Sequence, residues 1–399
     1  MKFNHTQTTL LGILSQVLTG KQFHIPADID WEELYRLSKA QAVAAMVFPC
    51  VAKQCADRGV FEQWKSFAMR SLQKNMNIHI QHTELHNLLT EHQIPYCIIK
   101  GCASAKDYPD PLMRAMGDVD FIILEKDWEK ALKVLTEDGF AVSGENHAFH
   151  ISLSKKNVDM EMHHEPFGID ENEGAMLQKI VPELVYNSVE VKNDIACFRM
   201  PDDFGHGIVI LLHAYRHLVD AGIGIRHLCD WAVLVSRYSN DEFISVFRER
   251  FQELGIWRLA QVFGATAHRY LNIPYQPWMG EKDAEVCEIL MQDILNSGNF
   301  GRNDADRWTQ NKAIYNVKNQ ISESNGMRQL MHTLNQNALE MYPRAMKCIF
   351  LRPFGWIILG IRYVFRVCTG RRKKVSSNFV KTVNMRKNLY QQLRAFQTE

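Results

Sequence analysis

Three acidic residues have the types and the spacing needed to bind a divalent cation. Asp118 and Asp120 stand two apart in the stretch 118–124, whose apolar residues predict a strand. Side chains at positions i and i+2 of a strand point the same way, so these two carboxylates converge. Glu161 lies on a second expected strand, 158–163, where polar and apolar residues alternate. If the two strands pair, Glu161 supplies a third carboxylate.

Oxygen ligands of this kind suit a hard cation, Mg²⁺ or Mn²⁺, which usually keeps substrate phosphates in its coordination shell. Three carboxylates that hold two such cations suit an in-line attack on the α-phosphate of a nucleoside triphosphate (NTP). One cation lowers the pKa of the attacking hydroxyl, and the other stabilises the leaving pyrophosphate. A D-x-D pair alone is common on exposed strands, so the residues upstream carry part of the argument.

Lys100 and Gly101 end the short apolar run 96–99, which predicts a buried strand followed by a tight turn. This turn is expected to open a helix whose N-terminus can face phosphate. Arg114 lies four residues before Asp118, within reach of a triphosphate or of the aspartates themselves. The alternative for Lys100 and Arg114 is a surface salt bridge.

Hydrophobic periodicity divides the chain into four expected regions. Residues 1–92 have helical spacing, and residues 93–200 alternate strand-like and helical runs. Residues 201–340 are again periodic like a helical bundle, and residues 341–399 form a tail that is first apolar and then basic. The predicted class is α+β, with one mixed sheet within 96–165 and helices on one of its faces.

The composition excludes several classes of protein. The chain has 399 residues, of which 46% are hydrophobic and 23% are charged, which argues against a disordered, collagen-like or polytopic membrane protein. A net charge of +1 gives no firm signal for nucleic-acid binding. Nine scattered cysteines without a C-x-x-C pair predict reduced thiols. No secretion signal is expected at the N-terminus, so the predicted location is cytoplasmic.

The order of these residues resembles a known family. Lys100-Gly101, Tyr108, Arg114, Asp118-Val119-Asp120 and Glu161-Met162-His163 are similar to the uncharacterised nucleotidyltransferase family of the DNA polymerase β superfamily. The similarity covers most of residues 90–305, including a histidine-rich stretch, 212–230, and the loop 299–301. It implies a polymerase-β-like nucleotidyltransferase core embedded in a mainly helical protein.

The resemblance also implies roles for single residues. Asp118, Asp120 and Glu161 would be the catalytic metal ligands, and Gly101 the glycine of the phosphate-side turn. The superfamily's next turn residue, Gly or Ser, is Cys102 here, with Ser104 two residues on. The candidate nucleotide-binding residues are Lys100, Gly101, Ser104 and Arg114. The candidate substrate contacts are Tyr108, His150, His163, His213, His217 and Arg226.

Two groups of histidines have spacings that a metal site could use. His213 and His217 stand i, i+4, but no H-E-x-x-H arrangement accompanies them, which favours a structural or substrate-contacting role over a zinc site. The histidines at 79, 82 and 86 have no carboxylate or cysteine cluster beside them, so a polar helix face is expected. Arg226 and Asp230, also i, i+4, are expected to form an ion pair along one helix, with a position facing the cleft as the alternative for either.

The tail has two interpretations that the sequence leaves open. Residues 345–374 carry aromatic and aliphatic side chains followed by basic ones, which suits a peripheral contact with the inner face of a membrane. A helix that packs on the bundle, followed by a basic end, fits the same pattern. The apolar run 354–361 is too short to span a bilayer, which needs about 20 residues.

The function predicted from the sequence is metal-dependent nucleotidyl transfer. A nucleoside monophosphate would pass from an NTP to an acceptor hydroxyl, with release of pyrophosphate, and the acceptor is not identified. The alternative is a catalytically inactive protein of the same fold that binds a nucleotide, a partner protein or a membrane.

Overall fold

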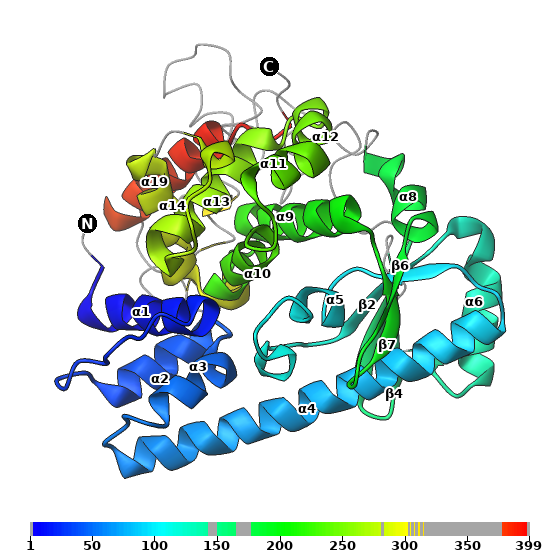
Figure 1. Ribbon diagram of the computed structural model, residues 1–399, viewed down its shortest axis with the longest axis horizontal. Coiled ribbons are helices and arrows are strands. Elements are labelled where there is room, and N and C mark those ends of the chain that lie inside the picture. The colour runs from blue at the N-terminus through cyan, green and yellow to red at the C-terminus, as the bar shows by residue number, and fades with distance from the viewer. Residues whose placement is uncertain are drawn as a thin grey trace, which may run out of the picture. The chain divides into compact units, whose positions relative to one another are not determined.

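The computed structural model describes residues 3–142, 150–164, 177–280, 283–301 and 377–396, together with positions 304, 307, 310, 311 and 314 (Figure 1). The chain divides into two compact units. One comprises Met1–Ala305 with Tyr390–Glu399, and the other is Asp306–Leu389. The sheet and the site described below belong to the first unit.

Four helices precede the sheet, as the helical spacing of residues 1–92 predicts. Asp30 and Asp57 cap the second and fourth, because each aspartate accepts a hydrogen bond from a backbone N–H three residues on, at 2.9 Å. The fourth helix has 34 residues and reaches from the other N-terminal helices to the sheet (Figure 1). These helices are α1 (His5–Thr19), α2 (Trp31–Ala40), α3 (Ala44–Val51) and α4 (Arg58–Glu91).

A mixed five-stranded sheet follows in the order β1-β2-β5-β4-β3, which confirms the predicted α+β class. Strands β2 and β5 are parallel neighbours, whereas the other pairs are antiparallel. The strands are β1 (Tyr96–Ile98), β2 (Val119–Ile123), β3 (Ala141–Val142), β4 (His150–Lys155) and β5 (Val158–His163). The helical elements among them are α5 (Cys102–Ala105), η1 (Pro111–Met113), η2 (Glu125–Asp127) and α6 (Trp128–Glu137).

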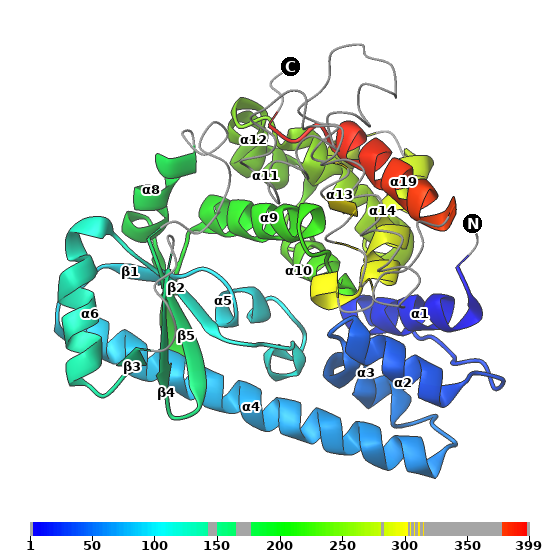
Figure 2. The same cartoon turned by 180° about the vertical axis from the view of Figure 1, so that it is seen from behind.

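The two faces of this sheet have opposite character. Val119 and Phe121 of β2, with Met160 and Met162 of β5, pack in one apolar core with side chains of α4 and α6. The residues between them in the sequence, Asp120 and Glu161 among them, therefore point to the other face. Helices α9 (Asp203–Val219) and α10 (Ile225–Val235) lie on that other side of the strands, so the expectation of helices on one face only is wrong (Figures 1 and 2).

A two-stranded hairpin, β6 (Val189–Lys192) and β7 (Cys197–Met200), was not predicted from the sequence. Phe198 and Met200 alternate into the sheet core, but each strand has only four residues and a short turn separates them. So short an alternation has little weight in sequence analysis. The hairpin lies against α4, where Thr83 Oγ1 accepts the N–H of Cys197 at 3.0 Å.

The remaining elements of the described chain are helical, as predicted for residues 201–340. Helices α9 and α10 cover the polar side of the sheet and supply side chains to the site. The helices are α8 (Ile180–Tyr186), α9 (Asp203–Val219), α10 (Ile225–Val235), α11 (Asn240–Phe243), α12 (Glu249–Glu253), α13 (Trp257–Leu271), α14 (Ala284–Ser297) and α19 (Ser377–Leu393), with a π-helical stretch Ile244–Arg248 and the 3-10 turns η4 (Pro277–Met279) and η5 (Asn299–Gly301).

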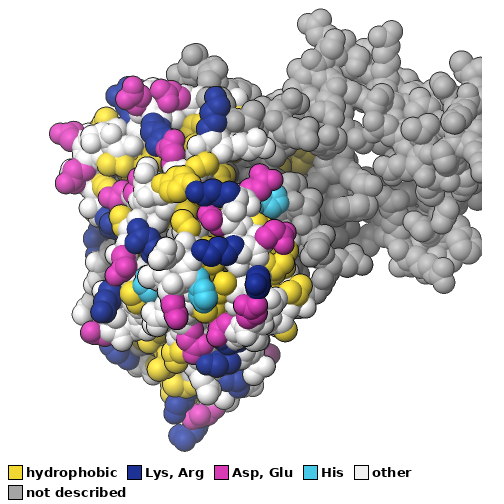
Figure 3. Space-filling model, turned by 90° about the vertical axis from the view of Figure 1, so that its right-hand side faces the viewer, with side chains coloured by type: hydrophobic (Ala, Val, Ile, Leu, Met, Phe, Trp, Pro, Cys, Tyr) yellow, Lys and Arg dark blue, Asp and Glu magenta, His cyan; other side chains and the backbone are white. Residues whose placement is uncertain are grey.

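Within the described residues no helix is both long enough and apolar enough to cross a membrane. The tail segment 345–374, for which a membrane contact was one of two interpretations, lies outside the described residues. The division into four regions stays a prediction. Basic and acidic side chains are interspersed on the face drawn in Figure 3, in keeping with the nearly equal numbers of the two kinds.

The expectation that His79, His82 and His86 form a polar surface of α4 is wrong. These three side chains are at most 7% exposed, because the hairpin and the sheet cover this side of the helix. Nδ1 of His79 lies 3.0 Å from Sγ of Cys102, and Nδ1 of His82 lies 2.8 Å from the carbonyl oxygen of Ile78. Burial lowers the pKa of His79 and of His82 to about 4, so both are neutral at pH 7.

These two histidines should make the fold sensitive to acid. Their pKa is about 4 in the folded protein against 6.5 for an ordinary histidine, so the unfolded chain binds more protons between these values. The free energy of unfolding should therefore fall as the pH drops from 6.5 to 4. Urea denaturation across this range should give a shallower slope for His82→Gln than for the wild type. The control, His92→Gln at the exposed end of α4, should keep the wild-type slope. Equal slopes in all three proteins would contradict the expectation.

Candidate active site

Three carboxylates meet at the polar face of the sheet. Asp118 immediately precedes β2, and the parallel register pairs Asp120 of β2 with Glu161 of β5. Paired residues on adjacent strands point to the same face and lie side by side. One oxygen from each of the three carboxylates lies within 4.8 Å of the others. The structure therefore brings together the residues that the D-x-D spacing and the second strand suggested.

An ammonium group and an imidazole contact this carboxylate cluster. Nζ of Lys100, at the end of β1, donates to Oδ1 of Asp120 at 2.9 Å. Nε2 of His163 lies 3.1 Å from Oδ1 of Asp120 and 3.3 Å from Oε2 of Glu161. Register explains both His163 contacts, because His163 follows Glu161 by two residues on the same face of β5.

The charges in the cluster separate the three acids. The negative charge of Asp120, together with burial, raises the pKa of Asp118 to about 6. Burial disfavours the ionised form of Asp120, but Lys100 and His163 outweigh it and hold the pKa of Asp120 well below its usual value. The hydrogen bond with His163 lowers the pKa of Glu161 in spite of burial. Asp118 is thus the acid whose charge is least compensated.

The three carboxylates line a cavity of about 290 Å³ between the sheet and helices α9 and α10. Its walls combine acids, cations, imidazoles and one aromatic ring. The lining residues are Lys100, Gly101, Ser104, Arg114, Met116, Gly117, Asp118, Asp120, Glu161, Ile210, His213, His217, Arg226, His227, Asp230 and Phe300. A site of this polarity suits a charged ligand better than an apolar one.

The turn after β1 has a conformation that requires glycine. Gly101 has φ +60° and ψ −114°, a combination that side chains with a Cβ avoid. The helix that it opens, α5, is a single turn of four residues, too short for a strong helix dipole toward phosphate. Cys102 is buried beneath this turn beside His79, whereas Ser104 reaches the cavity. A hydroxyl is therefore present at the site although the turn itself carries a thiol.

Arg114 contacts an aspartate of α10, and not Asp118 or Asp120 as the sequence suggested. Its guanidinium donates twice to the carboxylate of Asp230 on α10, each time at 2.7 Å, and both side chains are buried. Tyr108 donates to the same carboxylate at 2.7 Å, and it does not line the cavity. The expected ion pair between Arg226 and Asp230 is therefore wrong as the main partnership of Asp230. A two-pronged contact with a buried guanidinium is stronger than an i, i+4 pair along a helix.

Arg226 instead faces the cavity. Its Nη1 donates to the carbonyl oxygen of Ala115 at 2.7 Å, in the segment that leads to Asp118. Burial lowers the pKa of Arg226, and the neighbouring Arg114 adds to this effect. A half-buried guanidinium that faces a polar cavity is a better candidate for a phosphate contact than Arg114, which is buried and whose three nitrogens each already donate a hydrogen bond.

Three histidines form the wall contributed by α9 and α10. Nε2 of His217 lies 3.0 Å from Nε2 of His213, and the rings of both lie beside His227. Burial lowers the pKa of all three, that of His217 to about 4. Because these imidazoles are neutral, one Nε2 donates its proton to the other. His213 and His217 thus act as neutral hydrogen-bonding groups of the wall.

His150 lies at the outer side of the carboxylate cluster. Its Nε2 is 3.9 Å from Oε1 of Glu161, and its ring centroid is 5.2 Å from that of His163. Cross-strand pairing of His150 with His163 in β4 and β5 produces this position. His150 and His163 do not line the cavity itself, so their contact with it runs through Glu161 and Asp120.

A comparison with known families agrees with this geometry. Residues 27–272, more than half of the chain, match the family described as uncharacterised nucleotidyltransferase. The chain belongs to this nucleotidyltransferase family. No curated protein matches the sequence.

Two ring-bearing side chains in the cavity of this nucleotidyltransferase, those of His227 and Phe300, were not predicted as site residues. His227 follows Arg226 directly and has no spacing motif of its own, so only the packing of α10 against α9 reveals it. Phe300 was noted only as part of a loop. The structure gives Phe300 a positive φ of 55° and places its ring edge-on against His217, with centroids 4.9 Å apart. An aromatic residue with a left-handed backbone conformation at a cavity cannot be predicted from the periodicity of the sequence.

Breaking the contact between Arg114 and Asp230 should destabilise the fold strongly. Asp230→Asn keeps the side-chain shape but leaves a buried guanidinium without its counter-charge, which costs about 3–5 kcal/mol. Tyr108→Phe removes one hydrogen bond to the same carboxylate and should cost about 1 kcal/mol. Urea denaturation of the two variants, with Asp241→Asn on the exposed start of α11 as a control, measures the difference. A loss below 1 kcal/mol for Asp230→Asn would refute the buried ion pair.

Proposed function

We propose that this nucleotidyltransferase moves a nucleoside monophosphate from an NTP to an acceptor hydroxyl and releases pyrophosphate. The observation that carries the proposal is the meeting of Asp118, Asp120 and Glu161, with oxygens within 4.8 Å of one another, in a polar cavity. Family membership supports the class of reaction. The acceptor is identified only by its chemistry, a hydroxyl nucleophile.

The donor set fits a hard divalent cation. All three ligands are carboxylate oxygens, which Mg²⁺ and Mn²⁺ prefer. The raised pKa of Asp118, about 6, shows that the cluster has more negative charge than Lys100 and His163 offset. Asp118, Asp120 and Glu161 would hold the cations. When bound, these ions offset charge on the phosphoryl oxygens and lower the pKa of the attacking hydroxyl.

The remaining groups of the cavity then have separate tasks. Asp120 and Glu161 both have a lowered pKa, and Glu161 is the more exposed of the two. Glu161 is therefore available as a carboxylate to accept the proton of the acceptor hydroxyl. Lys100 and Arg226 would bind the triphosphate, since both are cationic and both line the cavity. Ser104 and the histidines of α9 provide neutral hydrogen bonds.

A second function has one observation in its favour. Lys100 and His163 already lie within hydrogen-bond distance of Asp120, so part of the cluster is satisfied without a metal. A catalytically inactive protein that binds a nucleotide would keep such contacts. Incubation with each labelled NTP and Mg²⁺ or Mn²⁺ in cell extract separates the two functions, because only the enzyme transfers label to a protein, an RNA or a small molecule.

Removal of each carboxylate should reduce transfer. Asp118→Asn and Asp120→Asn delete a metal ligand without changing shape, and each should slow transfer by about two to four decades. Glu161→Gln should abolish transfer but retain metal-dependent NTP binding, because the aspartate pair remains. Asp159→Asn on the exposed part of β5 is the matched control and should act like the wild type. If all three variants bind and transfer normally, the proposal is wrong.

The same aspartates should differ in their effect on stability. Asp118→Asn removes a charge that Asp120 repels, and it should raise the melting temperature by about 2–4 °C, the change that 1 kcal/mol produces in a large domain. Asp120→Asn removes the partner of Lys100 and His163 and should lower it. Thermal unfolding at neutral pH without added metal tests both signs. A higher melting temperature for Asp120→Asn would contradict the assigned contacts.

A further inference from the structure

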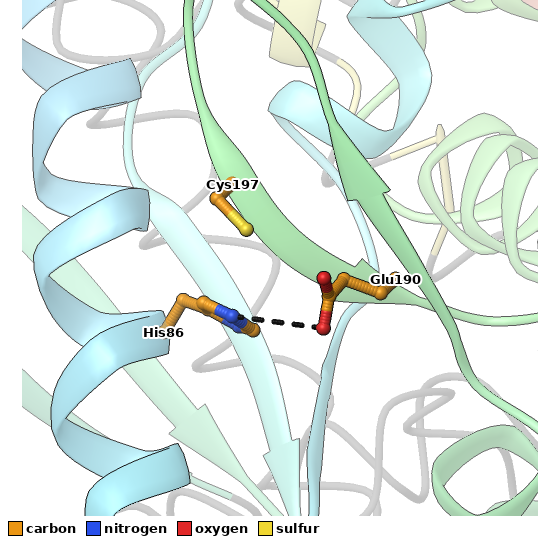
Figure 4. A group of neighbouring side chains, drawn as sticks. All are labelled: His86, Glu190 and Cys197. Carbon is orange, nitrogen blue, oxygen red and sulfur yellow. Dashed lines mark ion pairs between the residues drawn. The ribbon is translucent and has the colours of Figure 1, made fainter.

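Outside the candidate active site, a second cluster combines three different metal-binding side chains. His86 of α4, Glu190 of β6 and Cys197 of β7 each offer one ligand atom, and these atoms lie within 4.8 Å of one another (Figure 4). We propose that this cluster is a binding site for Zn²⁺ or a chemically similar divalent ion. It lies where the β6–β7 hairpin packs against α4, away from the cavity lined by Asp118 and Asp120.

The hairpin register places two of the ligands on one face. Glu190 pairs with Arg199, and Cys197 stands two residues before Arg199 on β7. Glu190 and Cys197 are therefore diagonal neighbours whose side chains point to the same side of the hairpin, within reach of each other. His86 approaches that side from α4, so a bound ion would join one helix to both strands.

The distances fit a coordinated ion better than direct contact. Nε2 of His86 lies 3.9 Å from Oε2 of Glu190, too far for a hydrogen bond. Bonds of about 2.0–2.3 Å to a tetrahedral ion separate two ligand atoms by roughly 3.3–3.6 Å. Glu190 is exposed, so a small rotation of its side chain brings its oxygen to that separation.

The histidine is already oriented by a contact behind it. Nδ1 of His86 lies 2.8 Å from the hydroxyl of Tyr96, a buried residue of β1. Metal-binding histidines usually hold their second nitrogen in such a contact, which fixes the ring and its tautomer. With an ion on Nε2, Nδ1 keeps its proton and donates a hydrogen bond to the hydroxyl oxygen of Tyr96.

The ligand types select the ion. A thiolate, an imidazole and a carboxylate together suit Zn²⁺, whereas Mg²⁺ prefers oxygen alone. Cys197 must lose its proton to bind, so binding releases one proton from the thiol to solvent. Thiolate and carboxylate together carry two negative charges, which balance the ion. The nearby cation, Arg199, donates from Nε to the hydroxyl of Ser188 at 3.0 Å and is thereby engaged outside the cluster.

A thiolate-specific signal distinguishes this site from the carboxylates around Glu161, which can also bind cations. Co²⁺ added to the metal-free, reduced full-length protein should produce a thiolate-to-cobalt charge-transfer band that saturates at one equivalent. Zn²⁺ should abolish that band by displacement. The band should persist in Glu161→Gln, which removes a ligand of the candidate active site only.

Matched variants assign the band. Cys197→Ser should abolish it, and Glu190→Gln should weaken Co²⁺ binding roughly tenfold or more. Cys55→Ser, the same change at another partly exposed cysteine, should leave the band intact. Zn²⁺ should raise the melting temperature of the wild type and of Cys55→Ser by more than that of Cys197→Ser, which keeps only the carboxylates around Glu161. Absence of the band in the wild type, or an equal band in Cys197→Ser, would overturn the proposal.

Discussion

Negative charge concentrated on one face of a sheet is the constraint on which the site depends. The parallel register of β2 and β5 sets Asp120 beside Glu161, and the D-x-D spacing adds Asp118. Three carboxylates this close repel one another unless cations approach, and in this structure Lys100 and His163 do so. The neighbouring elements can be understood by how they supply, offset or shield that charge.

The helical part of the fold is attached to the sheet through a second electrostatic contact. Arg114, in the segment that leads to β2, is held by Asp230 of α10, and Tyr108 donates to the same carboxylate. The segment carrying Asp118 is therefore positioned by a helix more than a hundred residues later in the chain. A buried ion pair of this kind adds little net stability over an apolar contact, but it allows one geometry only, because breaking it strands a charge.

Helix α4 links the remaining polar features. Its apolar positions close the sheet core, while His79 and His82 lie beneath the Gly101 turn and His86 faces the hairpin. Buried imidazoles are tolerated there because burial lowers the pKa of each and because Nδ1 of each ring has a neighbouring polar partner. The same helix thus supports the turn that carries Lys100 and supplies one side of the cluster with Glu190 and Cys197.

The sequence by itself determined the α+β class, the strand positions around the D-x-D pair and the three carboxylates, because strand period and residue type are local properties. It did not determine which cation meets which acid. Arg114 and Arg226 each stand four residues before an aspartate, Asp118 and Asp230 respectively. Only the packing of α10 on the sheet pairs Asp230 with Arg114. The burial of the α4 histidines depended likewise on a hairpin too short to predict. Partner choice among charges depends on distances between elements far apart in sequence, and those distances exist only in the tertiary structure.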